Sequence, residues 1–338
     1  MTTATASPGP HIEAVAITCA NAERSADFYC ERLGFPRLGE ERLEGGAQTT
    51  LFGLPDGQLQ RVQLQLGEER LDLIEVLDPG PGQRPGRPLP PDSRSCDLWF
   101  QHLCLVTADL AASLARLQPL LAAGTITAVS AAPQRLPDWN TAAAGILAFK
   151  FRDPDGHNLE LLQFPTGKGD PRWHCQRPAG ACELLGIDHT AIAIADSARS
   201  RAFYSQVLGL TALPSGENSG LEQDRLDGLH EVRVEITPLR CAAGMGIETL
   251  DYLPPNQGRT RLADQAPQDL AHWQIHLVAS GLEHIAESAE AFGGQRLAPG
   301  LLELPAGAGA SGRRRALRLA DPDGHQLLVL EAAGVSAP

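Results

Sequence analysis

Imidazole and carboxylate side chains recur at equivalent places along this 338-residue chain. Carboxylates occupy the second position of three short apolar segments of the form Ile/Leu-Glu-x-Leu, namely Glu75, Glu160 and Glu248. A fourth such segment has Leu328 at that position, and His102 and His189 precede two other apolar segments. Neutral imidazole and carboxylate are ligands for Fe, Ni, Mn, Co or Zn. A single His in a strand is usually structural, but two His and two Glu at equivalent positions favour a metal site.

An internal repeat carries these positions. Residues 23–35 match residues 198–210, and both segments have Phe-Tyr followed by Leu-Gly five residues after the Phe. Three further pairs of segments match in the same order: 73–79 with 246–252, 96–110 with 268–282, and 151–162 with 318–330. Self-similarity over this length indicates duplicated structural units. We therefore predict two homologous domains, residues 10–166 and 184–334.

Each half divides again into two similar modules. A short alternating apolar strand is followed by an Asp, Asn or Ser residue suited to cap a helix, then an amphipathic helix of about three turns, and then further strands. This pattern predicts an α+β fold of four βαβββ modules, residues 11–80, 97–165, 185–254 and 269–333. The proline-rich segments 79–95 and 164–182 are predicted to be linkers, because proline removes backbone donors.

The sequence Asp-Pro-Asp-Gly occurs before the last strand of both halves, beginning at Asp153 and Asp321. Asp at the start, Pro and a Gly that tolerates positive φ are typical of a tight turn. We interpret these segments, with His157 and His325, as structural rather than catalytic.

Charge and composition limit the possible partners. The formal net charge is -13, and the only run of basic residues is Arg313 to Arg315, so nucleic acid is not expected as a partner. The first residues lack a basic segment followed by an apolar one, and no stretch of about 18 apolar residues occurs. We expect a cytoplasmic protein that does not bind membranes. Seven cysteines without a Cys-x-x-Cys pair argue against a disulfide framework or a zinc ribbon.

The Phe-Tyr-x3-Leu-Gly signal after a first strand, the His that opens the second module and the Asp-Pro-Asp-Gly-x3-Glu ending resemble the vicinal oxygen chelate superfamily. This superfamily includes glyoxalase I, extradiol dioxygenases and bleomycin-resistance proteins. The resemblance covers nearly the whole chain outside the linkers. It implies that paired modules form half-barrel sheets and that metal ligands lie on the first and last strands of each module.

Carried over to this chain, the resemblance gives each module two candidate positions: Ala14 and Glu75, His102 and Glu160, His189 and Glu248, and Gln274 and Leu328. If modules pair in sequence, each half has a partial ligand set. If the second module pairs with the third, one half-barrel gathers His102, Glu160, His189 and Glu248 around one divalent metal ion. We favour this second pairing. Gln274 lies between His272 and His276, so a register shift of two residues would offer a His in the fourth module.

A polar loop precedes a strand of the second module, and it contains Arg135, Trp139 and Asn140. Loops of this kind often orient a ligand, so these three residues are the predicted substrate-binding residues. The corresponding segment of the fourth module is not similar. The alternative is an ordinary surface loop.

The resemblance and the ligand set together predict a metal-dependent enzyme of the glyoxalase type. Its small-molecule substrate would chelate the metal through neighbouring oxygens, the metal would stabilise an oxyanion, and Glu160 or Glu248 would transfer a proton in a lyase or isomerase reaction. An Fe(II) dioxygenase is the second hypothesis, although Lys150 stands where the extradiol pattern has Tyr. A non-catalytic binding protein is the third. The substrate, the metal and the formation of a homodimer stay open.

Overall fold

The computed structural model describes residues 9–175, 183–304 and 315–332. Cys182, Arg313 and Arg314 lie outside these ranges, as do parts of the second predicted linker and the end of the fourth module. The first module contains β1 (His11–Cys19), α1 (Ala22–Leu33), β2 (Arg37–Glu44), α2 (Gly46–Leu51), β3 (Gln58–Leu66) and β4 (Glu69–Asp78). The second contains β5 (Gln101–Thr107), α3 (Leu110–Ala122), β6 (Thr127–Ala128), β7 (Gln134–Arg135), β8 (Leu147–Arg152) and β9 (Asn158–Gln163).

A short helix, η1 (Pro171–His174), precedes the second half of the chain. The third module contains β10 (Leu184–Ile194), α4 (Ser197–Ala202), η2 (Phe203–Val207), β11 (Thr211–Ala212), β12 (Gly216–Ser219), α5 (Leu221–Asp227), β13 (Arg233–Arg240) and β14 (Gly246–Tyr252). The fourth contains β15 (Trp273–Ala279), α6 (Leu282–Ser288), η3 (Ala289–Phe292), β16 (Gln295–Glu303), β17 (Arg315–Ala320) and β18 (Gln326–Glu331). No helix in the described part of the chain is long and apolar enough to cross a lipid bilayer.

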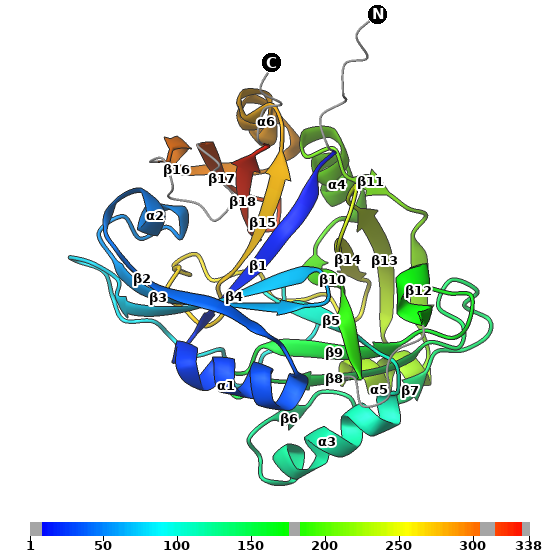
Figure 1. Ribbon diagram of the computed structural model, residues 1–338. Coiled ribbons are helices and arrows are strands. Elements are labelled where there is room, and N and C mark those ends of the chain that lie inside the picture. The colour runs from blue at the N-terminus through cyan, green and yellow to red at the C-terminus, as the bar shows by residue number, and fades with distance from the viewer. Residues whose placement is uncertain (1–8, 176–182, 305–314, 333–338) are drawn as a thin grey trace, which may run out of the picture.

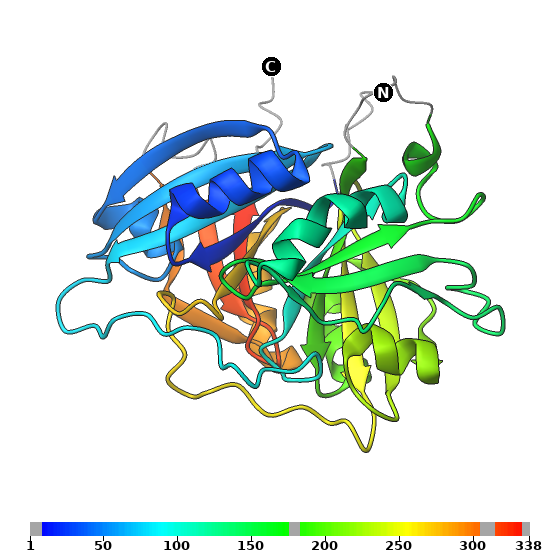
Figure 2. The same cartoon turned by 90° about the horizontal axis from the view of Figure 1, so that it is seen from below.

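The predicted α+β fold is confirmed, and it has two sheets. One sheet has eight strands in the order β16-β17-β18-β15-β1-β4-β3-β2, and the other has ten strands, of which eight follow the order β11-β13-β14-β10-β5-β9-β8-β6. The first module therefore shares a sheet with the fourth, and the second shares one with the third. Figures 1 and 2 show this division, with the first and fourth modules on one side and the second and third on the other.

Local sequence explains how the helices begin. The side chains of Asn21, Asp109 and Asp196 accept hydrogen bonds from backbone N–H groups in the first turns of α1, α3 and α4. Such caps satisfy donors that the helix itself leaves unpaired. The N-terminal signals predicted from the sequence are therefore confirmed for these three modules.

One large apolar core joins the helices to one face of both sheets. It includes Tyr29 of α1, Leu117 of α3, Tyr204 of η2 and Ile285 of α6. Strand residues that alternate with this set point to the opposite, concave faces, where separate clusters form. The helices therefore hold the two sheets together, and the helices do not cover the concave faces.

The repeated motifs meet at this junction. The hydroxyl of Tyr29 donates to Asp153 Oδ2 at 3.1 Å, and the hydroxyl of Tyr204 donates to Asp321 Oδ2 at 3.0 Å. In each half, the Phe-Tyr helix of one sheet is thus bonded to the Asp-Pro-Asp-Gly turn of the other. The rings of His157 and the fourth-module His325 contact backbone carbonyls of the opposite sheet. These contacts support the structural interpretation of both turns.

Removing one of these buried hydroxyls should destabilise the junction. We expect Tyr29→Phe and Tyr204→Phe each to lower the free energy of unfolding by about 1–2 kcal/mol, because each leaves a buried carboxylate with one donor fewer. Urea unfolding followed by circular dichroism measures this. Thr211→Val, which removes an exposed hydroxyl, is the control. Equal stability of all four proteins would show that the junction does not depend on these bonds.

Candidate metal centre

The ten-stranded sheet places the four predicted ligands in two neighbouring rows on one face. His102 of β5 and Glu248 of β14 both pair with Ala191 of β10, one on each side. In the next row, Cys104 of β5 pairs with His189 on one side and with Glu160 of β9 on the other. The residues between the polar side chains are small, so the imidazoles and carboxylates can turn toward one another.

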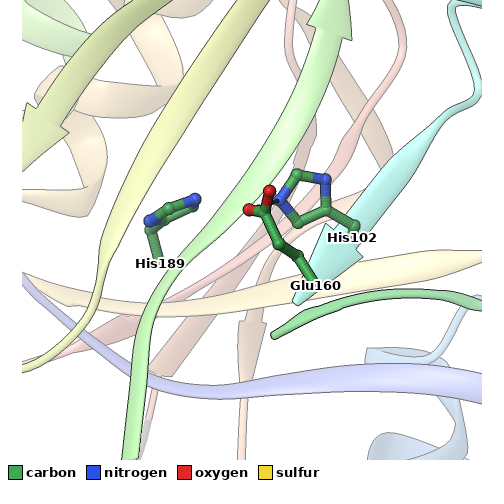
Figure 3. A group of neighbouring side chains, drawn as sticks. All are labelled: His102, Glu160 and His189. Carbon is green, nitrogen blue, oxygen red and sulfur yellow. Dashed lines mark ion pairs between the residues drawn. The ribbon is translucent and has the colours of Figure 1, made fainter. Parts of the chain in front are cut away.

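Three of the four ligands form a compact group. Atoms that could bind a metal on His102, Glu160 and His189 all lie within 4.8 Å of one another, and all three residues are buried. His102 Nε2 lies 3.3 Å from Glu160 Oε2, and the two imidazole centroids are 5.8 Å apart. Figure 3 shows the Glu160 carboxylate between the two rings.

Glu248 lies at the edge of this group. Its Oε2 is 3.4 Å from His189 Nε2, and its side chain is 22% exposed, against 7% for Glu160. It does not belong to the set whose atoms are all mutually close. The predicted quartet is therefore a close triad with a fourth carboxylate beside it.

The unsatisfied polar atoms of the group fit a divalent ion. His102 Nδ1, His102 Nε2 and His189 Nε2 are buried without a hydrogen-bond partner, since the 3.3 and 3.4 Å approaches of the carboxylates lack hydrogen-bond geometry. Buried polar atoms without partners are costly in a folded protein. A cation bound by the Nε2 atoms and the carboxylates would satisfy the Nε2 atoms of both rings.

A carboxylate behind His189 orients its ring. His189 Nδ1 lies 2.9 Å from Asp188 Oδ2, which leaves Nε2 facing Glu248. Trp173 Nε1 donates to the other oxygen of Asp188 at 3.3 Å. Histidines that bind metals commonly have a carboxylate on the second ring nitrogen, because it fixes the tautomer and raises the basicity of the ligand.

The electrostatics hold two of the candidate ligands, His102 and Glu160, in the protonation states that bind metal, whereas neighbouring carboxylates raise the pKa of His189. Burial lowers the pKa of His102 to about 4, so this imidazole is neutral at neutral pH. Burial alone would raise the pKa of Glu160, but the Lys150 ammonium and His102 outweigh it and lower the pKa to about 2. For Glu248 burial dominates and raises the pKa. Metal ligands must be deprotonated, and His102 and Glu160 meet that condition.

A cavity of about 180 Å³ opens beside the ligands. Its remaining wall is mostly apolar, with one ammonium, three amides and one hydroxyl, from Lys150, Asn140, Asn218, Gln223 and Tyr252. Of the three predicted substrate-binding residues, Asn140 lines this cavity. Trp139 is 60% exposed and Arg135 is paired with Asp138 at the surface, and neither lines it. The polar loop therefore reaches the cavity through one residue.

The eight-stranded sheet does not repeat the ligand set. The prediction that Glu75 is equivalent to Glu248 is wrong. Ala16, the counterpart of Ala191, pairs with Asp72, whereas Glu75 pairs with Cys19 further along the strand. Glu75 Oε2 accepts from the N–H of Ala22 at 2.9 Å and so satisfies the first turn of α1.

The other positions described in that sheet do not form a group of metal ligands either. Asp72 is buried against Arg70, with Nε 3.1 Å away, and His276 Nε2 lies 2.9 Å from Gln274 Oε1. Phe52 packs on the His276 ring, and the space beside Gln274 is only about 10 Å³. Among the described residues, metal-binding side chains therefore gather in one sheet only.

Sequence reasoning missed the buried ion pair beside Glu160. Lys150 of β8 pairs with Glu160 in the sheet, and its ammonium donates to Asp227 of α5 at 2.6 Å. A single Lys between Phe149 and Phe151 in an apolar strand was the available signal. Asp227 had no signal, because α5 connects two strands of the third module and its contact with Lys150 joins two modules.

Comparisons with known proteins agree with this architecture. The profile of the Glyoxalase/Bleomycin resistance protein/Dioxygenase superfamily matches residues 11–161 and again 186–329. The chain belongs to this superfamily. No curated protein matches the sequence.

Solved structures with a similar fold include glyoxalase I from Zea mays, with a TM-score of 0.58 and 13% identity over 96% of this chain and 92% of that chain. A point mutant of the same maize enzyme gives the same TM-score, with 14% identity over 96% of this chain and 94% of that chain. A putative dioxygenase from Bacillus subtilis has a TM-score of 0.53 and 11% identity over 97% of this chain and 86% of that chain. At these identities the likeness establishes the fold.

The geometry predicts one metal ion per chain. We expect His102→Gln and His189→Gln each to weaken Zn²⁺ or Ni²⁺ binding by at least about 100-fold, since changing even an outer-shell partner commonly costs 10–100-fold. Isothermal titration of metal-free protein, with elemental analysis of the loaded protein, measures this. His276→Gln in the other sheet is the matched control and should bind metal like the wild type. Undiminished binding by either site variant would contradict the assignment.

Proposed function

We propose that this protein is a divalent-metal-dependent enzyme of the glyoxalase type. Its substrate is a small molecule that chelates the metal through neighbouring oxygens, and the reaction moves a proton on a carbon next to one of them. The single observation that carries this proposal is the position of Glu248, 3.4 Å from His189 and outside the close triad. A carboxylate at the edge of a metal site, facing a cavity, is placed to take a proton from a bound ligand.

The two carboxylates differ in their surroundings. Glu160 is buried, close to His102, and held in its charged form by the Lys150 ammonium. Glu248 is more exposed and lines the cavity, and its nearest partner is an imidazole. This difference supports Glu160 as a permanent ligand and Glu248 as the group that accepts and returns the proton.

Each remaining residue of the site has a role that follows from its position. His102, His189 and Glu160 would hold the ion, and the ion would supply Lewis-acid stabilisation of the negative charge that forms on the substrate oxygen. Asp188 keeps Nε2 of His189 facing the site. The apolar wall, which includes Leu162 and Leu250, excludes water from the reacting carbon.

A second candidate, an Fe(II) dioxygenase, has one specific observation in its favour. Two imidazoles and one carboxylate, all mutually within 4.8 Å, are the ligand set of non-haem iron oxygenases and leave positions for a substrate and dioxygen. The similarity to a putative dioxygenase from Bacillus subtilis is compatible with this chemistry. Oxygen uptake by the Fe(II)-loaded protein in the presence of catechol, measured with an electrode, tests it.

Hydrogen exchange tests the proton-transfer role directly. The protein loaded with Zn²⁺, Ni²⁺ or Co²⁺ should exchange the C–H protons of hydroxyacetone or 2-hydroxyacetophenone with deuterium from D₂O, followed by NMR. We expect Glu248→Gln to slow exchange by about 10²–10⁴-fold, the usual contribution of a general base, while metal stays bound. Glu160→Gln should instead lose the metal.

Glu75→Gln is the matched control, because Glu75 caps a helix in the other sheet. Its exchange rate should equal that of the wild type. Exchange that persists in Glu248→Gln would move the proton-transfer role to another group. The absence of exchange in the metal-loaded wild type, combined with oxygen uptake with Fe(II), would favour the second candidate.

A further inference from the structure

The cavity contains one cationic side chain among the described residues that line it, Lys150. Its Nζ donates to Asp227 Oδ1 at 2.6 Å, and both side chains are almost completely buried, 6% and 0% exposed. A free ammonium in this place would be a receptor for a carboxylate or phosphate. Here the charge is already paired.

The partner carboxylate is itself held firmly. Its second oxygen accepts from Gln223 Nε2 at 2.7 Å and from the hydroxyl of Tyr252 at 3.0 Å. The carbonyl of Asp227 also accepts from Ser95 Oγ at 3.0 Å. If Lys150 turned toward a ligand, Asp227 would remain as a buried carboxylate without its counter-charge, which is strongly unfavourable.

With a divalent cation bound, the charges around the cavity would be balanced without a charged substrate. Among the residues that line the cavity or pair with its lysine, Glu160, Glu248 and Asp227 are three carboxylates against the single ammonium of Lys150, which leaves two negative charges. A divalent cation at the triad would bring this sum to zero. An anionic ligand would then add an uncompensated charge to a buried space, and burial of an unpaired charge is costly.

The polar groups that remain are uncharged. Asn140, Asn218 and Gln223 line the cavity as a connected chain, in which Asn140 Nδ2 donates to Asn218 Oδ1 and Asn218 Nδ2 donates to Gln223 Oε1 at 3.2 Å. Amides present both donors and acceptors to a neutral polar ligand. One water occupies about 10–15 Å³ of such a cavity. If each non-hydrogen atom of a ligand takes the place of one water, a cavity of about 180 Å³ admits a ligand of roughly a dozen non-hydrogen atoms.

From these observations we infer that the cavity selects an uncharged substrate of this size, such as an α-hydroxy ketone, a hydroxy amide or a diol. Lys150 is then a positioning residue for the Glu160 side of the site, and it does not receive a substrate anion. This inference rests on the proposed function in one respect, because it assumes that the ligand chelates the metal.

A matched pair of ligands tests the selectivity. Mandelamide and mandelate have the same shape and the same vicinal oxygens, and they differ in charge. Isothermal titration with each ligand is performed on both the metal-free and the Zn²⁺-loaded full chain. We expect mandelamide to bind at least as tightly as mandelate in both forms. Mandelate binding tenfold or more tightly, or no binding of mandelamide to either form, would overturn the inference.

Freeing the ammonium should change the preference. In Asp227→Asn the charge of Lys150 loses its partner, so affinity for mandelate should rise at least about tenfold relative to mandelamide. The double variant Lys150→Met/Asp227→Asn lacks both charges and should not show this gain. Circular dichroism and thermal unfolding establish that both variants are folded, and removal of both members of a buried pair is generally tolerated better than removal of one.

An unchanged ligand preference in folded Asp227→Asn would contradict the role of the ion pair. The titrations measure binding and not turnover, and they include the metal-free protein. Selectivity for the neutral ligand without hydrogen exchange would therefore disprove the proposed reaction alone. Exchange with a preference for mandelate would disprove the selectivity alone.

Discussion

The antiparallel pairing of β5 with β10 is the contact on which the candidate metal centre depends. It joins the second module to the third and sets a register in which Ala191 lies between His102 and Glu248. A shift of this register by one residue would send one strand's side chains to the opposite face, into the apolar core. The large side chains of that core, together with the bonds from Tyr29 and Tyr204 to the opposite turns, oppose such a shift.

The same constraint acts on the eight-stranded sheet with a different outcome. Its central strands β1 and β15 pair in the same way, but the ligand positions hold Ala14, Asp72, Gln274 and Leu328. Asp72 is neutralised by arginine, and Phe52 with its apolar neighbours occupies the concave face. One sheet thus fills its concave face with apolar packing, while the other keeps a cavity lined by the candidate metal ligands.

Burying charged groups around the cavity costs free energy unless each charge has a partner. Three carboxylates and an ammonium lie around it, and each needs a partner that the apolar wall does not supply. The sheet provides Lys150 directly opposite Glu160, and α5 provides Asp227 for Lys150. The fold therefore balances one carboxylate with the ammonium and leaves two negative charges, which a divalent cation would neutralise.

The sequence by itself determined the four modules, the helix caps of the first three, the Asp-Pro-Asp-Gly turns and the strands that carry His102, Glu160, His189 and Glu248. These features depend on alternation, capping and turn chemistry over a few residues, so they can be read locally. Only the tertiary structure decided which modules share a sheet, and it assigned Glu75 to a helix cap and Asp72 to the position of Glu248.

The tertiary structure also revealed the pair of Lys150 and Asp227, and it showed that Asn140, rather than Arg135 or Trp139, reaches the cavity. These outcomes could not be predicted because strand pairing and contacts between modules depend on both partners at once. The residues that meet are separated by long stretches of chain, so the local pattern around one residue does not indicate which distant residue it contacts.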